Sequence, residues 1–201
     1  MITIENITSY EKDNLPQIAA TLDEADIHQL VEWLNEKDDN LRYKSFLLLQ
    51  HRSQEKNDVY PYWDVFVEKF GSENSYQRSL GLMLVAENTR WDDAGKMDGI
   101  IDAFLAFCDD EKPITVRQCI QSLAKIIPYK KNLYDKIVAK LISIDVMERK
   151  ETQRKILLVD ILTVLSTIKK QQTNEKIEQY FQNVLTGGTL DAKTKKTILA
   201  L

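Results

Sequence analysis

The sequence has few of the residues that form tight turns, with 6 glycines and 4 prolines among 201 residues. Folds rich in β-hairpins need many such residues, because glycine supplies positive φ angles and proline a preset φ in short turns. Their scarcity argues against a β-rich fold. Hydrophobic residues make up 43% of the chain and charged residues 29%, which is typical of a chain that folds around a core.

Cysteine and histidine are also scarce, with two of each. Cys108 and Cys119 lack the C-x-x-C spacing of metal or redox sites, and two thiols without a disulfide framework fit a reducing compartment. His28 and His51 have no partner at i, i+4 that would complete a metal pair on a helix. We therefore predict no metal site, no cofactor and no catalytic triad.

Long apolar runs and a basic excess are absent as well. No run approaches the roughly 20 apolar residues that span a bilayer, and the first residues lack the pattern of a secretory signal. The formal net charge is -4, whereas proteins that bind nucleic acid or anionic membranes usually carry a basic excess. We predict a cytoplasmic protein that binds no membrane and for which nucleic acid is a disfavoured partner.

An internal repeat is the main positive feature of the sequence. Five segments share acidic residues in a turn, then a basic residue, then an apolar helix, although the fifth copy is weak. The basic residues are Arg42, Arg78, Arg117, Arg154 and Lys195, at spacings of 36, 39, 37 and 41 residues. This period is typical of two-helix repeats. The positions three residues after each basic residue, Gly81 among them, and seven residues after each of the four arginines are small or apolar. They share one helix face, which indicates a packing seam.

A more amphipathic helix is predicted before each of these seam helices. The predicted spans are residues 27–36, 60–70, 97–108, 133–144 and 175–185. Pro61 and Pro113 suit the first turns of helices, and Gly71 suits a helix end. A further helix over residues 10–22, started or broken by Pro16, is expected to cap the apolar end of the stack.

The repeat layout resembles the second helix of HEAT repeats in the armadillo-type superfamily. Leu41 with Arg42, and Val116 with Arg117, match the apolar-Arg step of that helix, whereas a glutamine precedes the second and fourth arginines. The resemblance covers about residues 25–201.

This resemblance implies an all-α fold, a right-handed α-α superhelix of about five helical hairpins. It implies one domain over residues 1–201, with an N-terminal cap at 1–24 and repeats at 25–201. The superfamily contains scaffolds, transport receptors, regulators and a few enzymes, so the resemblance indicates a fold more than a function.

The predicted function is a non-catalytic scaffold or adaptor that binds a protein or peptide. Positions one, five, eight and twelve residues after each arginine lie beside the seam, and we expect them to line the concave surface. This face is mixed in character, as in a protein-binding groove rather than a nucleic-acid track. The candidate binding residues on it are Tyr43, Gln50, Met83, Arg90, Lys125 and Tyr129.

Asp160 is a seventh candidate, because it interrupts an apolar helix where the other repeats have leucine. A carboxylate in such a place is costly unless it is paired, and its pKa could be raised. It could therefore bind a small ligand in a crevice, as in a regulatory subunit, or form an ion pair with Arg117 or Lys195 of a neighbouring repeat. We favour the ion pair.

An alternative function is nucleic-acid binding or DNA repair. The repeated basic residues could contact phosphates, and Trp33, Trp63 and Trp91 could stack on bases, as tryptophan does in some HEAT-repeat alkylpurine DNA glycosylases. No motif of those enzymes aligns with this chain residue by residue. We expect the arginines to pair with carboxylates of the repeat turns and the tryptophans to pack between helices.

Overall fold

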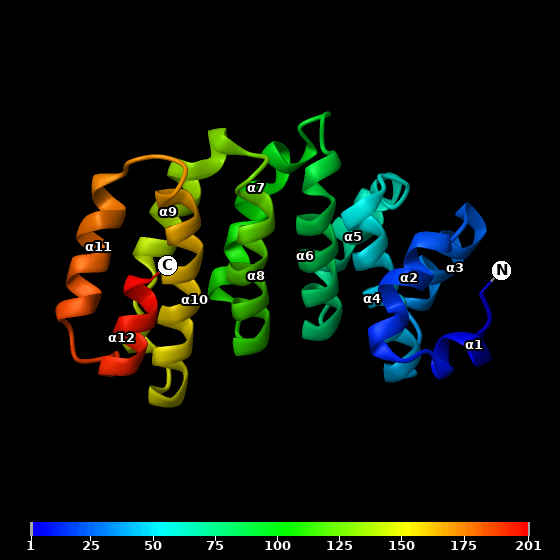
Figure 1. The fold of residues 1–201 in the computed structure, drawn as a ribbon, viewed down its shortest axis with the longest axis horizontal. Coiled ribbons are helices and arrows are strands. Elements are labelled where there is room, and N and C mark those ends of the chain that lie inside the picture. Colours follow the sequence, from blue (N-terminus) through cyan, green and yellow to red (C-terminus); the bar gives the residue numbers. More distant parts are fainter. Residues whose placement is uncertain (1, 201) are drawn as a thin grey trace. The chain divides into compact units, whose positions relative to one another are not determined.

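The computed structural model describes residues 2–200, which form twelve α-helices joined by turns and short 3₁₀ segments, with no β-strand in this range (Figure 1). The prediction of an all-α fold is confirmed for these residues. The helices cluster into two compact units, unit 1 up to Gly95 and unit 2 from Lys96 onward. That residues 1–201 form one domain stays a prediction.

Unit 1 is organised around one long helix, α4. Its helices are α1 (Ile4–Ser9), α2 (Leu15–Thr21), α3 (Glu24–Trp33), α4 (Asp39–Glu55), α5 (Trp63–Glu68) and α6 (Ser75–Asn88). Four of them, α1, α2, α3 and α6, pack on α4, and α5 packs on α6. The pairs α3–α4 and α5–α6 are therefore two successive helical hairpins in contact through their second helices.

The N-terminal segment differs from the single predicted capping helix. Two helices, α1 and α2, precede the first hairpin, and both pack on α4. Pro16 lies in the first turn of α2, where its missing N–H breaks no helical hydrogen bond. The prediction missed α1 because this helix has six residues and buries only Ile7, so no apolar periodicity is visible.

Unit 2 is organised in the same way around α10. Its helices are α7 (Lys96–Ala106), α8 (Pro113–Ile126), α9 (Tyr134–Ser143), α10 (Glu151–Lys169), α11 (Glu175–Thr186) and α12 (Ala192–Leu199). The 3₁₀ turn that extends α7 packs on α8, α8 packs along α10, and α10 also contacts α9, α11 and α12 (Figure 1).

The amphipathic helices predicted from the sequence correspond to α3, α5, α7, α9 and α11, with shifted ends. The largest shift is in α3, which begins at Glu24 because Asp23 forms a capping box with Asp26 there. The span predicted for 60–70 is filled by α5 together with 3₁₀ turns at Tyr60–Tyr62 and Lys69–Gly71. Pro61 and Pro113 occupy first-turn positions as predicted.

Polar residues of the repeat turns cap the seam helices. Asp38 accepts a hydrogen bond from the Leu41 N–H at the start of α4, and Asp191 accepts one from the Thr194 N–H at the start of α12. Each cap satisfies a backbone donor that the first turn of a helix leaves unpaired. The acidic turn of the repeat is thus explained, at these two hairpins, by local helix capping.

The basic residues of the repeat close the turn before their own helix. The donor and acceptor pairs are Arg42 with the Glu36 carbonyl (2.7 Å), Arg78 with the Ser72 and Glu73 carbonyls (both 2.9 Å), Arg154 with the Arg149 carbonyl (2.8 Å) and Lys195 with the Gly187 carbonyl (2.8 Å). We had predicted carboxylate partners, and Arg42 does also contact the Asp39 carboxylate. Arg117 instead bonds a carboxylate outside its turn, that of Asp160 on α10. The turn carbonyls are available as acceptors because carbonyls at the end of a helix have no partner within it.

No helix within residues 2–200 combines the length and the apolar character that crossing a membrane would require.

Candidate functional site

Asp160 forms an ion pair inside unit 2. It lies on α10 with 8% of its surface exposed, and its carboxylate accepts Arg117 Nε at 2.6 Å and Arg117 Nη2 at 3.3 Å. Gln121 of α8 donates a further hydrogen bond at 2.9 Å. The hydrogen bond with Asp160 raises the pKa of the Arg117 guanidinium, although burial acts in the opposite direction. The predicted pair with a neighbouring hairpin is confirmed, with Arg117 rather than Lys195 as the partner.

Arg117 also lines a cleft between α8 and α10 that is open to solvent. The lining residues are Pro113, Val116 and Arg117 of α8, Arg149 of the turn before α10, and Gln153, Ile156 and Leu157 of α10. The cleft is mostly apolar. Of its two guanidinium groups, that of Arg117 pairs with Asp160, and that of Arg149 donates to the Cys108 carbonyl at 3.2 Å and lies 3.9 Å from the Asp109 carboxylate.

Ile156 lines this cleft and is 42% exposed. Ile114, next to Pro113 in the chain, is exposed as well. Met147, in the turn before Arg149, is also exposed but lines a different cleft, with Glu151 and Arg154. Neighbouring apolar side chains exposed around a cleft are typical of a protein-binding surface. The sequence analysis missed these residues because they lie outside the repeat positions assigned to the concave face.

The candidate residues of unit 1 lie on the packed helices α4 and α6 and in the turn after α6. Tyr43 is exposed and stacks on Phe46 with ring centroids 6.4 Å apart, while Gln50 and Met83 are half-buried. Arg90 is half-buried and donates to the Gln54 carbonyl near the end of α4. Arg90 therefore has a structural partner, as the repeat arginines do.

The other candidates in unit 2 are Lys125 on α8 and Tyr129 in the turn after it, and both are exposed. Further positions of the predicted concave face are buried in the packing of their own units, for example Leu47, Ala86 and Ser122. The face is thus less open than expected. That the seven candidate residues bind a partner stays a prediction.

The tryptophans have packing roles. Trp33 and Trp63 are buried, so their rings are not available to stack on bases, and the prediction that they pack between helices is confirmed. Trp91 is partly exposed and donates its indole N–H to the Ser53 carbonyl at 2.7 Å.

Cys108 and Cys119 are both fully buried, with their sulfur atoms 3.6 Å apart. Burial raises the pKa of the Cys119 thiol well above its usual value, which disfavours the reactive thiolate. Within residues 2–200, no three His, Cys, Asp or Glu side chains are grouped so that they could hold a metal ion.

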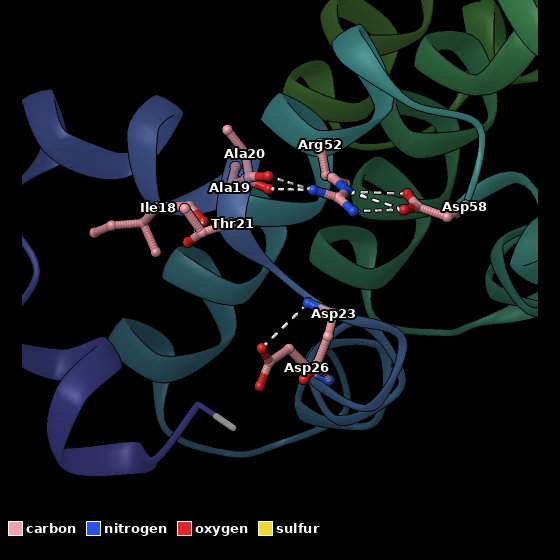
Figure 2. A network of polar contacts seen from close by, with 8 residues as sticks. All are labelled: Ile18, Ala19, Ala20, Thr21, Asp23, Asp26, Arg52 and Asp58. Atoms are coloured by element: carbon pink, nitrogen blue, oxygen red, sulfur yellow. Dashed lines mark hydrogen bonds and ion pairs between the residues drawn. The ribbon is translucent and has the colours of Figure 1, made fainter.

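Arg52 is a polar centre of unit 1 that the sequence analysis did not identify. It is 4% exposed, and its Nε and Nη2 donate to the Asp58 carboxylate at distances from 2.6 to 3.1 Å. Its Nη1 donates to the Ala19 and Ala20 carbonyls at 2.9 and 2.8 Å, at the C-terminal end of α2 (Figure 2). A cation there satisfies carbonyls that lack helical partners. Its role is therefore to hold α2 on α4.

No protein-family model, curated protein or solved structure was found to match this chain.

Replacing Asp160 with asparagine is expected to lower the free energy of unfolding by about 1–3 kcal/mol, because the half-buried Arg117 loses its charged acceptor while the side-chain volume is kept. Urea denaturation measures the change. The matched control is Asp102→Asn, since Asp102 pairs with Lys136 but has an 81% exposed side chain, and its loss should cost at most about 1 kcal/mol. Equal losses in the two variants would contradict the structural role of the Asp160 pair.

Proposed function

We propose that this protein is a HEAT-like α-solenoid that acts as a non-catalytic scaffold and binds a peptide segment of a protein partner. The repeated basic residue supports this architecture, because it closes the same turn in hairpins of both units. Helical-repeat proteins bury one face in the stack and leave helix edges and grooves for partners.

The observation that carries the binding function is the apolar cleft between α8 and α10. Val116, Ile156 and Leu157 provide apolar walls, and Arg149, whose guanidinium is partly exposed and lies 3.9 Å from the Asp109 carboxylate, provides positive charge. This lining suits a segment with an aliphatic side chain flanked by a carboxylate. The aliphatic group would leave water, and the carboxylate would accept charge-assisted hydrogen bonds from a guanidinium.

The two alternatives have less support. The basic residues of the repeat are engaged with turn carbonyls, and two of the three tryptophans are buried, which leaves little for a nucleic acid to contact. A small ligand held by Asp160 would have to displace Arg117 and Gln121 from its carboxylate.

Selection of a random peptide library against the full chain tests the proposal. Selected peptides are expected to combine an aliphatic residue with a nearby Asp or Glu. The substitution Ile156→Asp is expected to weaken their binding at least about tenfold, because the bound peptide would remove water from the new carboxylate in the apolar wall. The matched control is Ile4→Asp, since Ile4 of α1 is an exposed isoleucine outside this cleft. Equal binding by the two variants, or peptides that lack an acidic residue, would contradict the assignment.

A further inference from the structure

Lys69 of unit 1 is a buried cation in an unusual environment. It begins the 3₁₀ turn after α5 and is 7% exposed. Its Nζ donates to Asn35 Oδ1 at 2.7 Å and to Gln77 Oε1 at 2.8 Å. Gln77 in turn donates its amide N–H to the Leu34 carbonyl at 2.7 Å, which orients its oxygen toward Lys69. The ammonium group is thus held in place by two side chains.

Both acceptors of Lys69 are neutral amides, so its charge is solvated by dipoles and not by a bonded carboxylate. An ammonium group carries three N–H donors, and these two hydrogen bonds use two of them. Burial lowers the pKa of Lys69 and the charge of Arg42 acts in the same direction, whereas Glu68 acts against them. Burying a charge without a counter-ion is costly, and an anion that reached the third N–H would reduce that cost.

The three hydrogen-bonded side chains, Asn35, Lys69 and Gln77, line one cleft that is open to solvent. Its remaining lining residues are Val65, Glu68 and Ser72. The Ser72 hydroxyl accepts the Asn74 N–H at 3.2 Å, which leaves its own proton available to a ligand. The cleft therefore combines one buried positive charge, a hydroxyl donor, the Glu68 carboxylate and one apolar side chain, that of Val65.

We propose that this cleft binds the carboxylate of a short aliphatic monocarboxylic acid, which accepts hydrogen bonds from Lys69 Nζ and from the Ser72 hydroxyl. The alkyl chain lies against Val65. A single negative charge fits the site because Glu68 also lines the cleft and would repel a dianion such as phosphate. The site is independent of the peptide-binding function proposed above, since all of its residues belong to unit 1.

Titration of the full chain with sodium propionate, followed by NMR of the Asn35 and Gln77 side-chain amides, tests the site. Saturable binding with a dissociation constant in the millimolar range or tighter is expected, and propionamide, which lacks the charge, should not bind. Lys69→Met should weaken propionate binding at least about tenfold. Ser72→Ala removes a half-buried hydroxyl and its hydrogen bond from the Asn74 N–H, and it should weaken propionate binding about threefold or more. This second variant keeps the test valid if Lys69→Met impairs folding.

The matched control is Lys136→Met, because Lys136 of α9 is exposed and bonds Asp102 at the surface of unit 2. This variant should bind propionate as the unmodified chain does. Undiminished binding by both Lys69→Met and Ser72→Ala, or tighter binding of inorganic phosphate than of propionate, would overturn the proposal. Binding of a tripeptide with a free C-terminal carboxylate, but not of propionate, would also overturn the assignment to a free acid.

Discussion

Arg52→Met is expected to lower the free energy of unfolding by about 3 kcal/mol. The substitution keeps most of the apolar stem and removes all the hydrogen bonds that join α4 to Asp58 and to the Ala19 and Ala20 carbonyls. The buried Ala19 carbonyl and the partly buried Ala20 carbonyl then lose this donor, and the Asp58 carboxylate loses its counter-ion. The Asp58 side chain is partly exposed and regains some hydration, which places the expected loss at the lower end of the range for broken buried pairs.

Urea denaturation measures this loss, and hydrogen exchange locates it. Faster exchange is expected first in α2, because Arg52 closes the end of that helix. Arg52→Lys should have an intermediate effect. An ammonium group keeps the charge, but it lacks the planar guanidinium that donates to the carboxylate and to both carbonyls at the same time. The control is Lys56→Met, because Lys56 is exposed at the end of the same helix. Similar losses for Arg52→Met and Lys56→Met would show that the buried network contributes little.

Gly81→Val is expected to have the other large effect, a loss of about 3 kcal/mol or more in the free energy of unfolding. A Cβ atom at position 81 would lie 2.6 Å from the Phe66 carbonyl oxygen and 3.0 Å from the Lys69 Cβ. The closest atom belongs to the backbone of α5, so α6 must move away from α5 as a whole. Gly81→Ala should produce the same effect with a smaller magnitude.

Gly99→Ala is the matched control, because Gly99 also lies inside a helix, α7, but a Cβ there has no atom within 4 Å. This substitution should raise the free energy of unfolding by up to about 1 kcal/mol, since alanine loses less backbone entropy in a helix than glycine. Thermal denaturation should therefore shift the midpoint downward for Gly81→Ala and upward for Gly99→Ala. Shifts of the same sign would contradict the close approach of α6 to α5.

Local sequence determined the helices and their order. The period of 36 to 41 residues, the apolar spacing within each helix and the positions of Pro61 and Pro113 depend on residues close together in the chain, and the structure has the corresponding helices and first turns. The repeat alignment also predicted that Asp160 forms an ion pair, because it places this acidic residue at a position that is leucine in the other repeats. The structure shows that pair with Arg117. Periodicity could not locate α1, which is too short to display it.

Only the tertiary structure decided which polar side chains meet. Arg52 bonds carbonyls more than 30 residues away in the chain, and Lys69 bonds Asn35 across a similar distance. The partners of the repeat arginines were predicted only in part: Arg42 pairs with the Asp39 carboxylate of its turn, whereas Arg117 bonds Asp160 and Arg154 bonds the Arg149 carbonyl, because the geometry of each turn selects the acceptor. The sequence by itself thus determined an all-α chain with a two-helix period. The clefts at Ile156 and Lys69 exist because packing brings together side chains that share no sequence pattern.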